Sequence, residues 1–214
     1  MLTWTKIAGA GGNPSGPSLV AGYAVGFFDE NGLDSAAEGN TNFPVMSDAQ
    51  AGDLILFHAC AGNAGGYTFG DLTSPYIRDT TWPAYERGDT WYDIVDGSSV
   101  NPYFPSPSAG KWDGFVGICA LFRGVSSLHS ITRSTTNTPA ANAGGALTVI
   151  IGIRDSDSPG ASVTPPSGYT MIGQAIGTQS PYRAFQAMAY CVGYVTPGAW
   201  TGSTLYGTRT IRLD

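Results

Sequence analysis

The sequence predicts an all-β protein: an antiparallel β-sandwich of the jelly-roll kind with about nine strands. Three observations favour this class. The 214 residues include 30 glycines and 14 prolines, and only 12% are charged. Short apolar runs alternate with clusters of turn-forming residues, which is typical of closely spaced strands. No stretch shows the apolar spacing of an amphipathic helix. With 42% hydrophobic residues, the chain can bury a core and is not expected to be disordered.

The N-terminal part is expected to be an edge strand and a flexible arm, together residues 1–17. The strand would lie at 2–8, and the arm follows because 9–17 reads GAGGNPSGP. The rest, 18–214, is interpreted as a single β-sandwich domain. Its first strand, at 18–28, contains Gly22 and Gly26, and glycine within a strand indicates a bulge or a close backbone approach.

The domain reads as two similar halves, 18–125 and 144–214. In each half, an apolar run follows a glycine, after Gly52 and again after Gly145. The first of these runs is apolar on both faces and predicts a central strand. The second alternates apolar and polar residues, as a half-buried strand does. We interpret 126–143, rich in Ser, Thr and Asn, as the crossover between the halves. The expected strands after the first are 53–60, 90–96, 114–123, 146–153, 168–176, 184–195 and 204–212.

A rigid turn is predicted at 164–169. Pro165 and Pro166 fix the backbone and withhold hydrogen-bond donors. Gly168 can then take the left-handed conformation that reverses the chain. We therefore expect Gly168 to have a positive φ, or to lie against another backbone, and the following strand to dock beside 184–195.

Charge and cysteine content exclude several classes of partner. The net charge is −6 and the only lysines are Lys6 and Lys111, so the clustered basic residues of a nucleic-acid-binding surface are missing. No apolar run approaches the length of a membrane span, and the N-terminus lacks the pattern of a signal peptide. Cys60, Cys119 and Cys191 lie within apolar runs without metal-site spacing, so we expect buried thiols, no metal and no cofactor.

Three motifs resemble a known family. They are Ala51-Gly52-Asp53-Leu54-Ile55-Leu56, Ala120-Leu121-Phe122-Arg123-Gly124-Val125 and Thr164-Pro165-Pro166-Ser167-Gly168-Tyr169-Thr170. In this order they are similar to the AGDLL, FRGV and TPPSGWT-type motifs of β-sandwich (jelly-roll) structural proteins of bacteriophage virions, over roughly 45–212. The second half departs from the pattern with Gly145-Ala146 in place of Gly-Asp, and 61–113 is longer and more aromatic. The resemblance implies a structural or attachment role and supplies no catalytic residues.

Few residues are candidates for catalysis. His58 lies in an apolar run, where a core histidine is expected. His129 lies near Ser126, Ser127 and Ser130, but no G-x-S-x-G motif accompanies it. Asp155-Ser156-Asp157-Ser158 resembles part of a calcium loop without its later ligands, so a turn is favoured.

One aromatic and acidic cluster is the candidate contact site. Its aromatic members are Tyr76, Trp82, Tyr85, Trp91 and Tyr92, and its acidic members are Asp79, Glu86, Asp89, Asp93 and Asp96. Three interpretations are open. The rings can belong to the core, with Trp91 and Ile94 inward and Trp82 at an edge. They can contact a protein partner, or they can bind a glycan.

These observations together predict a non-enzymatic phage virion protein, above all a capsid decoration (cement) protein on the outer shell. Its partners would be the major capsid protein and copies of itself, as a trimer or dimer. It would be made in the host cytoplasm. The alternative is a tail or head fibre module that binds a host surface glycan. The third hypothesis, a jelly-roll polysaccharide-degrading enzyme, requires two carboxylates about 5–9.5 Å apart.

Overall fold

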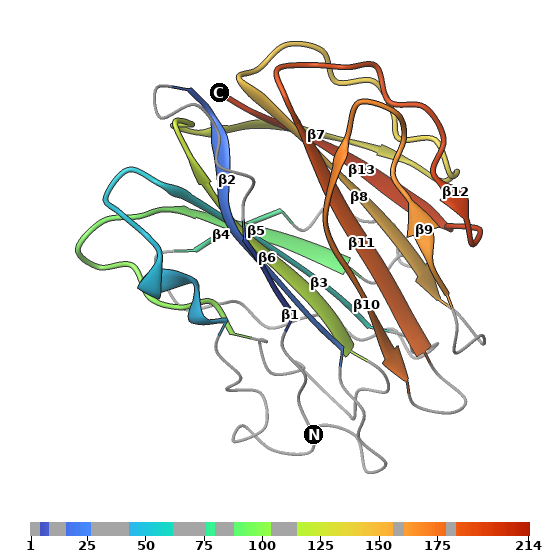
Figure 1. The fold of residues 1–214 in the computed structure, drawn as a ribbon, viewed down its shortest axis with the longest axis horizontal. Coiled ribbons are helices and arrows are strands. Elements are labelled where there is room, and N and C mark those ends of the chain that lie inside the picture. Colours follow the sequence, from blue (N-terminus) through green and yellow to red (C-terminus); the bar gives the residue numbers. More distant parts are fainter. Residues whose placement is uncertain are drawn as a thin grey trace.

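The computed structural model describes residues 5–8, 16–26, 43–61, 76–79, 88–103, 115–155, 161–178 and 183–214. Two antiparallel sheets face each other, which confirms the predicted β-sandwich (Figure 1). The Trp82 and Tyr85 candidates, the flexible part of the expected arm, and 156–160 lie outside the described residues.

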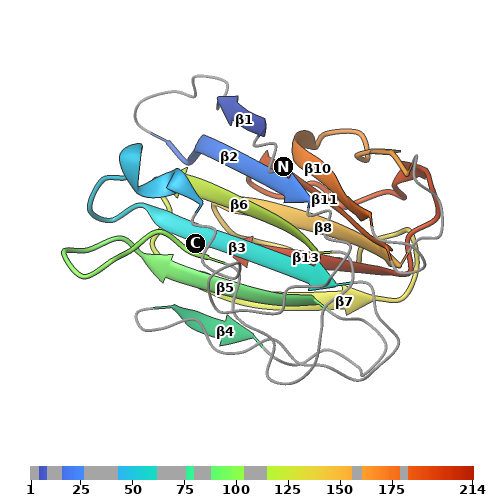
Figure 2. The ribbon, with the colours of Figure 1, turned by 90° about the horizontal axis from the view of Figure 1, so that it is seen from below.

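Sheet 1 has six strands in the order β1-β2-β6-β3-β5-β4, which Figure 2 shows side by side. Its strands are β1 (Thr5–Ala8), β2 (Ser18–Gly26), β3 (Leu54–Ala61), β4 (Ile77–Asp79), β5 (Gly88–Ile94) and β6 (Phe115–Arg123). A short 3-10 helix, η1 (Pro44–Ser47), precedes β3. The expected N-terminal edge strand is thus present as β1.

Sheet 2 has five strands in the order β10-β11-β8-β13-β7. Its strands are β7 (Leu128–Ser134), β8 (Leu147–Asp155), β10 (Thr170–Thr178), β11 (Arg183–Val192) and β13 (Gly207–Leu213). A two-residue pair, β9 (Val163–Thr164) with β12 (Thr201–Gly202), forms a separate small sheet. The main sheets therefore exceed the nine strands expected.

The expected crossover at 126–143 is wrong in one respect, because it contains strand β7. This strand reads LHSITRS and lies at the edge of sheet 2, where its side chains are half-buried or exposed. A strand in such a place needs no continuous apolar face, so its polar composition hid it. β4 is a three-residue edge strand that was not predicted from the sequence, for the same reason.

The two sheets do not exchange strands, and they share one strand order. Without β1, sheet 1 reads β2-β6-β3-β5-β4, and sheet 2 reads β7-β13-β8-β11-β10 from its opposite end. In chain order, β2, β3, β4, β5 and β6 thus correspond to β7, β8, β10, β11 and β13. The topology is that of an internal repeat.

Local details repeat with the topology. β2 has a bulge at Val20, where it pairs with β6, and β7 has a bulge at His129, where it pairs with β13. Gly52, before β3, has φ 87°, and Gly145, before β8, has φ 91°. The two halves therefore use the same backbone geometry at equivalent points, with different side chains.

Three apolar clusters hold the sandwich together. The inter-sheet core lies between the sheets and takes Leu54 and Leu56 from β3, with Val149 and Ile151 from β8. The outer cluster of sheet 1 takes the alternate residues of β3 and is covered by η1 and the chain after β5. The outer cluster of sheet 2 lies under the β9 and β12 segments. β3 is buried on both faces, which explains its continuous apolar run. Its predicted central position is confirmed by the strand order of sheet 1.

The turn at 164–169 has the predicted geometry. Gly168 has φ 87°, and the Tyr169 amide donates to the Pro166 carbonyl at 3.1 Å. β10 then pairs with β11. The Tyr169 hydroxyl donates to the Val195 carbonyl at 2.6 Å, which ties the turn to the chain after β11.

Replacing Gly168 by valine is expected to lower the free energy of unfolding by about 1–3 kcal/mol, because β-branched residues resist positive φ. A Cβ at this position would also lie 3.1 Å from the Val195 side chain. Gly193 has φ 71°, and a Cβ added there would have no atom within 4 Å. Gly193→Val therefore measures the cost of backbone strain without a side-chain clash. Gly97→Val, in open space without positive φ, is the neutral control. Urea unfolding of the three variants gives the comparison, and equal losses in Gly168→Val and Gly97→Val would contradict the prediction.

Candidate functional site

The candidate aromatic residues are largely structural where they are described. Trp91 on β5 is fully buried in the outer cluster of sheet 1 and stacks on Phe57, with ring centroids 5.4 Å apart. Tyr76, just before β4, is 8% exposed. Its hydroxyl donates to the Val100 carbonyl at 2.7 Å, and burial raises its pKa. Neither ring is available to a partner.

Tyr92 lies on the opposite face of β5, half-buried against the inter-sheet core. Because side chains alternate along a strand, Trp91 and Tyr92 point in opposite directions and cannot form one platform. The same alternation corrects the expectation that Trp91 and Ile94 share a face. Ile94 packs on the inter-sheet core, whereas Trp91 belongs to the outer cluster. An exposed aromatic surface in 76–92 therefore depends on Trp82 and Tyr85 alone.

The carboxylates of β5 do not form a glycosidase pair. Asp89 and Asp93 are both buried and lie on the same face, four residues apart. At about 3.3 Å per residue, their backbones are about 13 Å apart, whereas the carboxyl groups of a glycosidase pair lie about 5–9.5 Å apart. Burial raises the pKa of Asp93, which accepts a hydrogen bond from the Ser99 hydroxyl at 2.6 Å. Asp96 is exposed, and hydrogen bonds from Ser98 lower its pKa, as in an ordinary turn.

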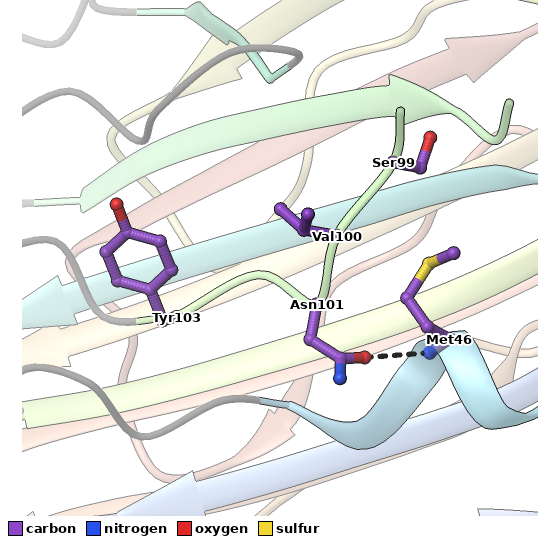
Figure 3. A pocket seen from close by; sticks show the side chains of 5 residues that line it. All are labelled: Met46, Ser99, Val100, Asn101 and Tyr103. Atoms are coloured by element: carbon purple, nitrogen blue, oxygen red, sulfur yellow. Dashed lines mark hydrogen bonds between the residues drawn. The ribbon is translucent and has the colours of Figure 1, made fainter. Parts of the chain in front are cut away.

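An open pocket of about 460 Å³ was not anticipated from the sequence (Figure 3). Its lining residues are Met46, Ser99, Val100, Asn101 and Tyr103. The Asn101 side-chain oxygen accepts from the Met46 amide at 2.8 Å, which turns the amide nitrogen away from η1. Among the described residues, the lining offers an aromatic ring, a hydroxyl, an amide and apolar groups, and no carboxylate, histidine, cysteine or lysine.

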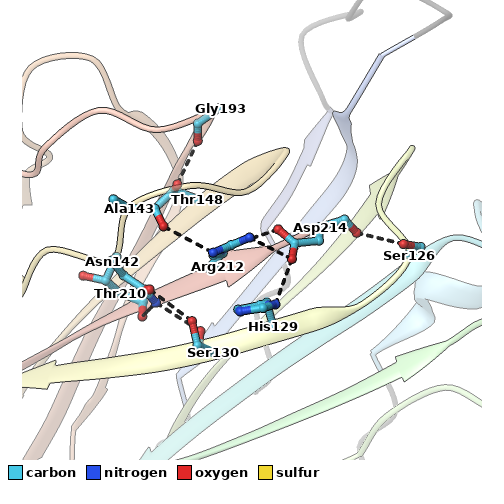
Figure 4. Close-up of polar contacts among 10 residues, drawn as sticks. All are labelled: Ser126, His129, Ser130, Asn142, Ala143, Thr148, Gly193, Thr210, Arg212 and Asp214. Carbon is cyan, nitrogen blue, oxygen red and sulfur yellow. Dashed lines mark hydrogen bonds and ion pairs between the residues drawn. The ribbon is translucent and has the colours of Figure 1, made fainter.

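His129 lies in a polar cluster at the end of β13 (Figure 4). Its Nδ1 is 2.9 Å from the Asp214 carboxylate, and the Arg212 guanidinium donates to both oxygens of that carboxylate, at 2.9 and 3.1 Å. The bulge in β7 places the imidazole there, because the extra residue turns its side chain out of the regular alternation.

The serines near His129 have other partners in the described structure. The Ser130 hydroxyl bonds to Asn142 at 3.0 Å, and the Ser126 hydroxyl donates to the Asp214 backbone carbonyl at 3.1 Å. The Ser126 and Ser127 amides donate to that carbonyl as well. The arrangement anchors the end of β13 to the chain before β7. Among the described residues no hydrogen bond joins a serine hydroxyl to His129, so the geometry is that of a structural clamp.

Two motifs of the virion-protein resemblance meet in space. Asp53, from the Ala-Gly-Asp motif, accepts two hydrogen bonds from Arg123 of the Phe-Arg-Gly motif, at 2.9 and 2.8 Å, although the residues are 70 positions apart. Asp53 is almost fully buried and also accepts from the Gln50 amide at 2.9 Å. The motif residues thus lock the start of β3 to the end of β6. This pair was missed because a sequence does not show which distant residues face each other.

Asp53→Asn is expected to lower the free energy of unfolding by about 2 kcal/mol, because one charge-assisted bond to Arg123 becomes a clash of donors. Lys6→Gln, which removes the exposed 2.9 Å pair with Asp48, is the matched control and should change stability little. Chemical unfolding measures both. A loss in Asp53→Asn no larger than in the control would show that the Asp53–Arg123 pair contributes nothing.

A second group of polar side chains is buried between the sheets. His58, Thr90, Gln186 and Arg209 are all fully buried. Arg209 donates to the Thr90 hydroxyl and to the Gly88 carbonyl, and Gln186 donates to the His58 carbonyl at 3.2 Å. His58 is a core residue, as expected, but neither ring nitrogen has a hydrogen-bond partner within the described residues.

The remaining expectations concern metals, thiols and membranes. Cys60, Cys119 and Cys191 are buried and form no disulfide, which confirms their predicted place in the core. Within the described ranges, no group of three or more His, Cys, Asp or Glu side chains could hold a metal ion. In the same part of the chain, no helix has the length and apolar character needed to cross a membrane.

Comparison with protein-family models finds no match to this chain. Searches of curated proteins and of solved structures find no match either.

Proposed function

We propose that this chain is a non-enzymatic structural protein of a bacteriophage virion, a decoration (cement) protein on the outer capsid surface. The observation that carries the proposal is the ordered set of three motifs that resemble such proteins. These motif residues have structural roles in the fold: Asp53 and Arg123 lock two strands, and Gly168 makes the turn before β10. The resemblance therefore rests on residues that define the sandwich rather than on scattered glycines.

Two further properties support this role. The net charge is −6, which favours the outer surface of a shell over contact with packaged DNA. Both outer faces of the sandwich are buried under segments of the same chain, so the described part of the molecule is a stiff block whose edges and loops remain for contacts. The expected partners are the major capsid protein and copies of this chain.

Quantitative mass spectrometry of purified phage particles tests the proposal. A decoration protein is expected in a copy number comparable to that of the capsid subunits. The purified chain should also bind to expanded capsid shells that were assembled without it. A few copies per particle would reject decoration and favour a tail part, and absence from purified particles would reject a virion role.

A second candidate, a fibre module that binds a host glycan, is favoured by the open pocket at Tyr103. Its volume lies in the range of small-ligand sites. Tyr103→Ala and Trp82→Ala should then both reduce adsorption of particles to host cells, whereas Tyr206→Ala, at an exposed ring outside the pocket, should not. Equal adsorption of all variants would remove this candidate.

A further inference from the structure

Strand β7 forms one edge of sheet 2. In the described structure it pairs with β13 alone. Its counterpart in the repeat, β2, is not an edge strand, because β1 pairs with its other side. The two halves thus differ at one structural position: an added strand closes sheet 1, and nothing among the described strands closes sheet 2.

The registers show which residues of β7 correspond to the segment that receives β1. In sheet 1, β1 pairs with residues 21–24, and Ala21 and Ala24 lie opposite Leu121 and Ile118 of β6. β6 pairs with β3 in the first half as β13 pairs with β8 in the second. When these two pairings are superimposed, Leu121 and Ile118 of β6 correspond to Arg212 and Arg209 of β13. These lie opposite Ser130 and Arg133. Residues 130–133 are therefore the equivalent edge.

The bulge at His129 does not prevent a strand from pairing there. Bulges and inward charges are devices that protect exposed edges. β2 has its bulge at the same position, at Val20, and still pairs with β1 over the next four residues. Arg133 pairs in register with Arg209 and so faces the inter-sheet side rather than across the edge.

The other edges are poorer receptors for a strand. β1 and β4 have four and three residues. β10 is interrupted by a bulge between Met171 and Gly173, and its later part lies against the end of β2. β7 has seven residues and contains neither lysine nor proline, the residues that most often guard an edge.

We propose that β7 pairs antiparallel with the β7 of a second copy of this chain, about a two-fold axis, so that sheet 2 continues across the dimer. The strand is suited to pairing with itself. Ser130, Thr132 and Ser134 alternate on the outer face, so a register centred on Ile131 or Thr132 places small polar side chains opposite one another. Their hydroxyl groups keep their hydrogen bonds within the chain, so the pairing rests on the backbone groups of the edge. Such an interface uses the same surface patch on both copies, so assembly stops at the dimer. The proposal does not depend on the virion role, because it concerns the isolated chain.

Sedimentation velocity over a dilution series is the first test. The wild-type chain is expected to approach twice its 22.2 kDa mass as concentration rises. Thr132→Lys places two like charges close to the axis, directly opposite each other in the register centred on Thr132 and diagonally across in the register centred on Ile131. It should weaken the dimer by roughly tenfold or more. Thr170→Lys, the same change at an exposed position on the far edge strand β10, should leave it unchanged. A thermal melt shows whether each variant is folded.

Cross-linking tests the register independently of any loss of folding. Opposite residues of antiparallel strands have Cα atoms about 4.5–5.5 Å apart, within the range of a disulfide. One of Ile131→Cys and Thr132→Cys is therefore expected to form a disulfide-linked dimer on oxidation, and Thr170→Cys is not. The three natural cysteines are buried and should not interfere. A monomer at all concentrations, a dimer insensitive to Thr132→Lys, or equal cross-linking through Thr170→Cys would each overturn the proposal.

Discussion

Gly26→Ala is expected to lower the free energy of unfolding by more than about 3 kcal/mol, at the upper end of what overpacking costs. A Cβ at Gly26 would lie 1.9 Å from the Ile176 carbonyl oxygen and 2.5 Å from its carbon. Both atoms belong to the backbone of β10, which is fixed by its pairing with β11. The methyl group can be accommodated only if the end of β2 separates from sheet 2.

The matched control is Gly97→Ala. A methyl group added at Gly97 would have no atom within 4 Å, and the residue has no positive φ, so the change should be neutral or slightly stabilising. Urea unfolding of both variants measures the difference. If Gly26→Ala unfolds at nearly the wild-type urea concentration, the corner between β2 and β10 is looser than the structure indicates.

Gly26 also shows what sequence alone could predict. A glycine within a strand indicates a bulge or a close backbone approach, and this one meets β10. The positive φ of Gly168 was predictable for a similar reason, since two prolines precede it and a strand must follow. In both cases the information is local, and a local rule was sufficient.

The features that were missed depend on distant contacts. β7 has a polar sequence because an edge strand requires little burial, and its role is visible only beside β13. The Asp53–Arg123 pair joins two motifs that the sequence presents separately. The two similar halves were expected from the glycine before an apolar run in each, but their side chains differ, since Asp53 corresponds to Ala146 while the glycine before each keeps nearly the same φ.

The candidate site was the least predictable part. Tyr76 and Trp91 belong to the outer cluster of sheet 1, and the sequence could not show that this sheet has a second buried face. Tyr76 and Tyr169 occupy equivalent positions before β4 and β10. Their hydroxyls donate to backbone carbonyls in the segments that follow β5 and β11, respectively. The described aromatic residues therefore serve mainly to bury the outer faces of the two sheets rather than to form a binding surface. The open pocket combines Met46 with 99–103, which only the fold brings together.

His58 gives the chain a built-in sensitivity to acid. Its ring is fully buried between the sheets and packs so closely against Gly88 that a Cβ added there would lie 2.8 Å from it. Arg209 of β13 and Gln186 of β11 lie beside it. Burial, and then the positive charge of Arg209, hold the pKa of His58 well below its ordinary value of 6.5.

The unfolding free energy is therefore expected to fall as pH decreases below 6.5. In that range unfolded chains bind a proton at His58 and folded chains do not, so acid favours unfolding by up to about 1.4 kcal/mol per pH unit. His58→Leu should remove this slope, because the position then has no proton to bind. His129→Gln, at the exposed histidine, is the control and should keep it. Asp48, whose pKa is lowered below 3.8 by hydrogen bonds from Lys6 and Tyr23, contributes only at more acidic pH. Urea unfolding between pH 7.5 and about 5 separates the two groups. An unchanged slope in His58→Leu would mean that another group controls the acid response.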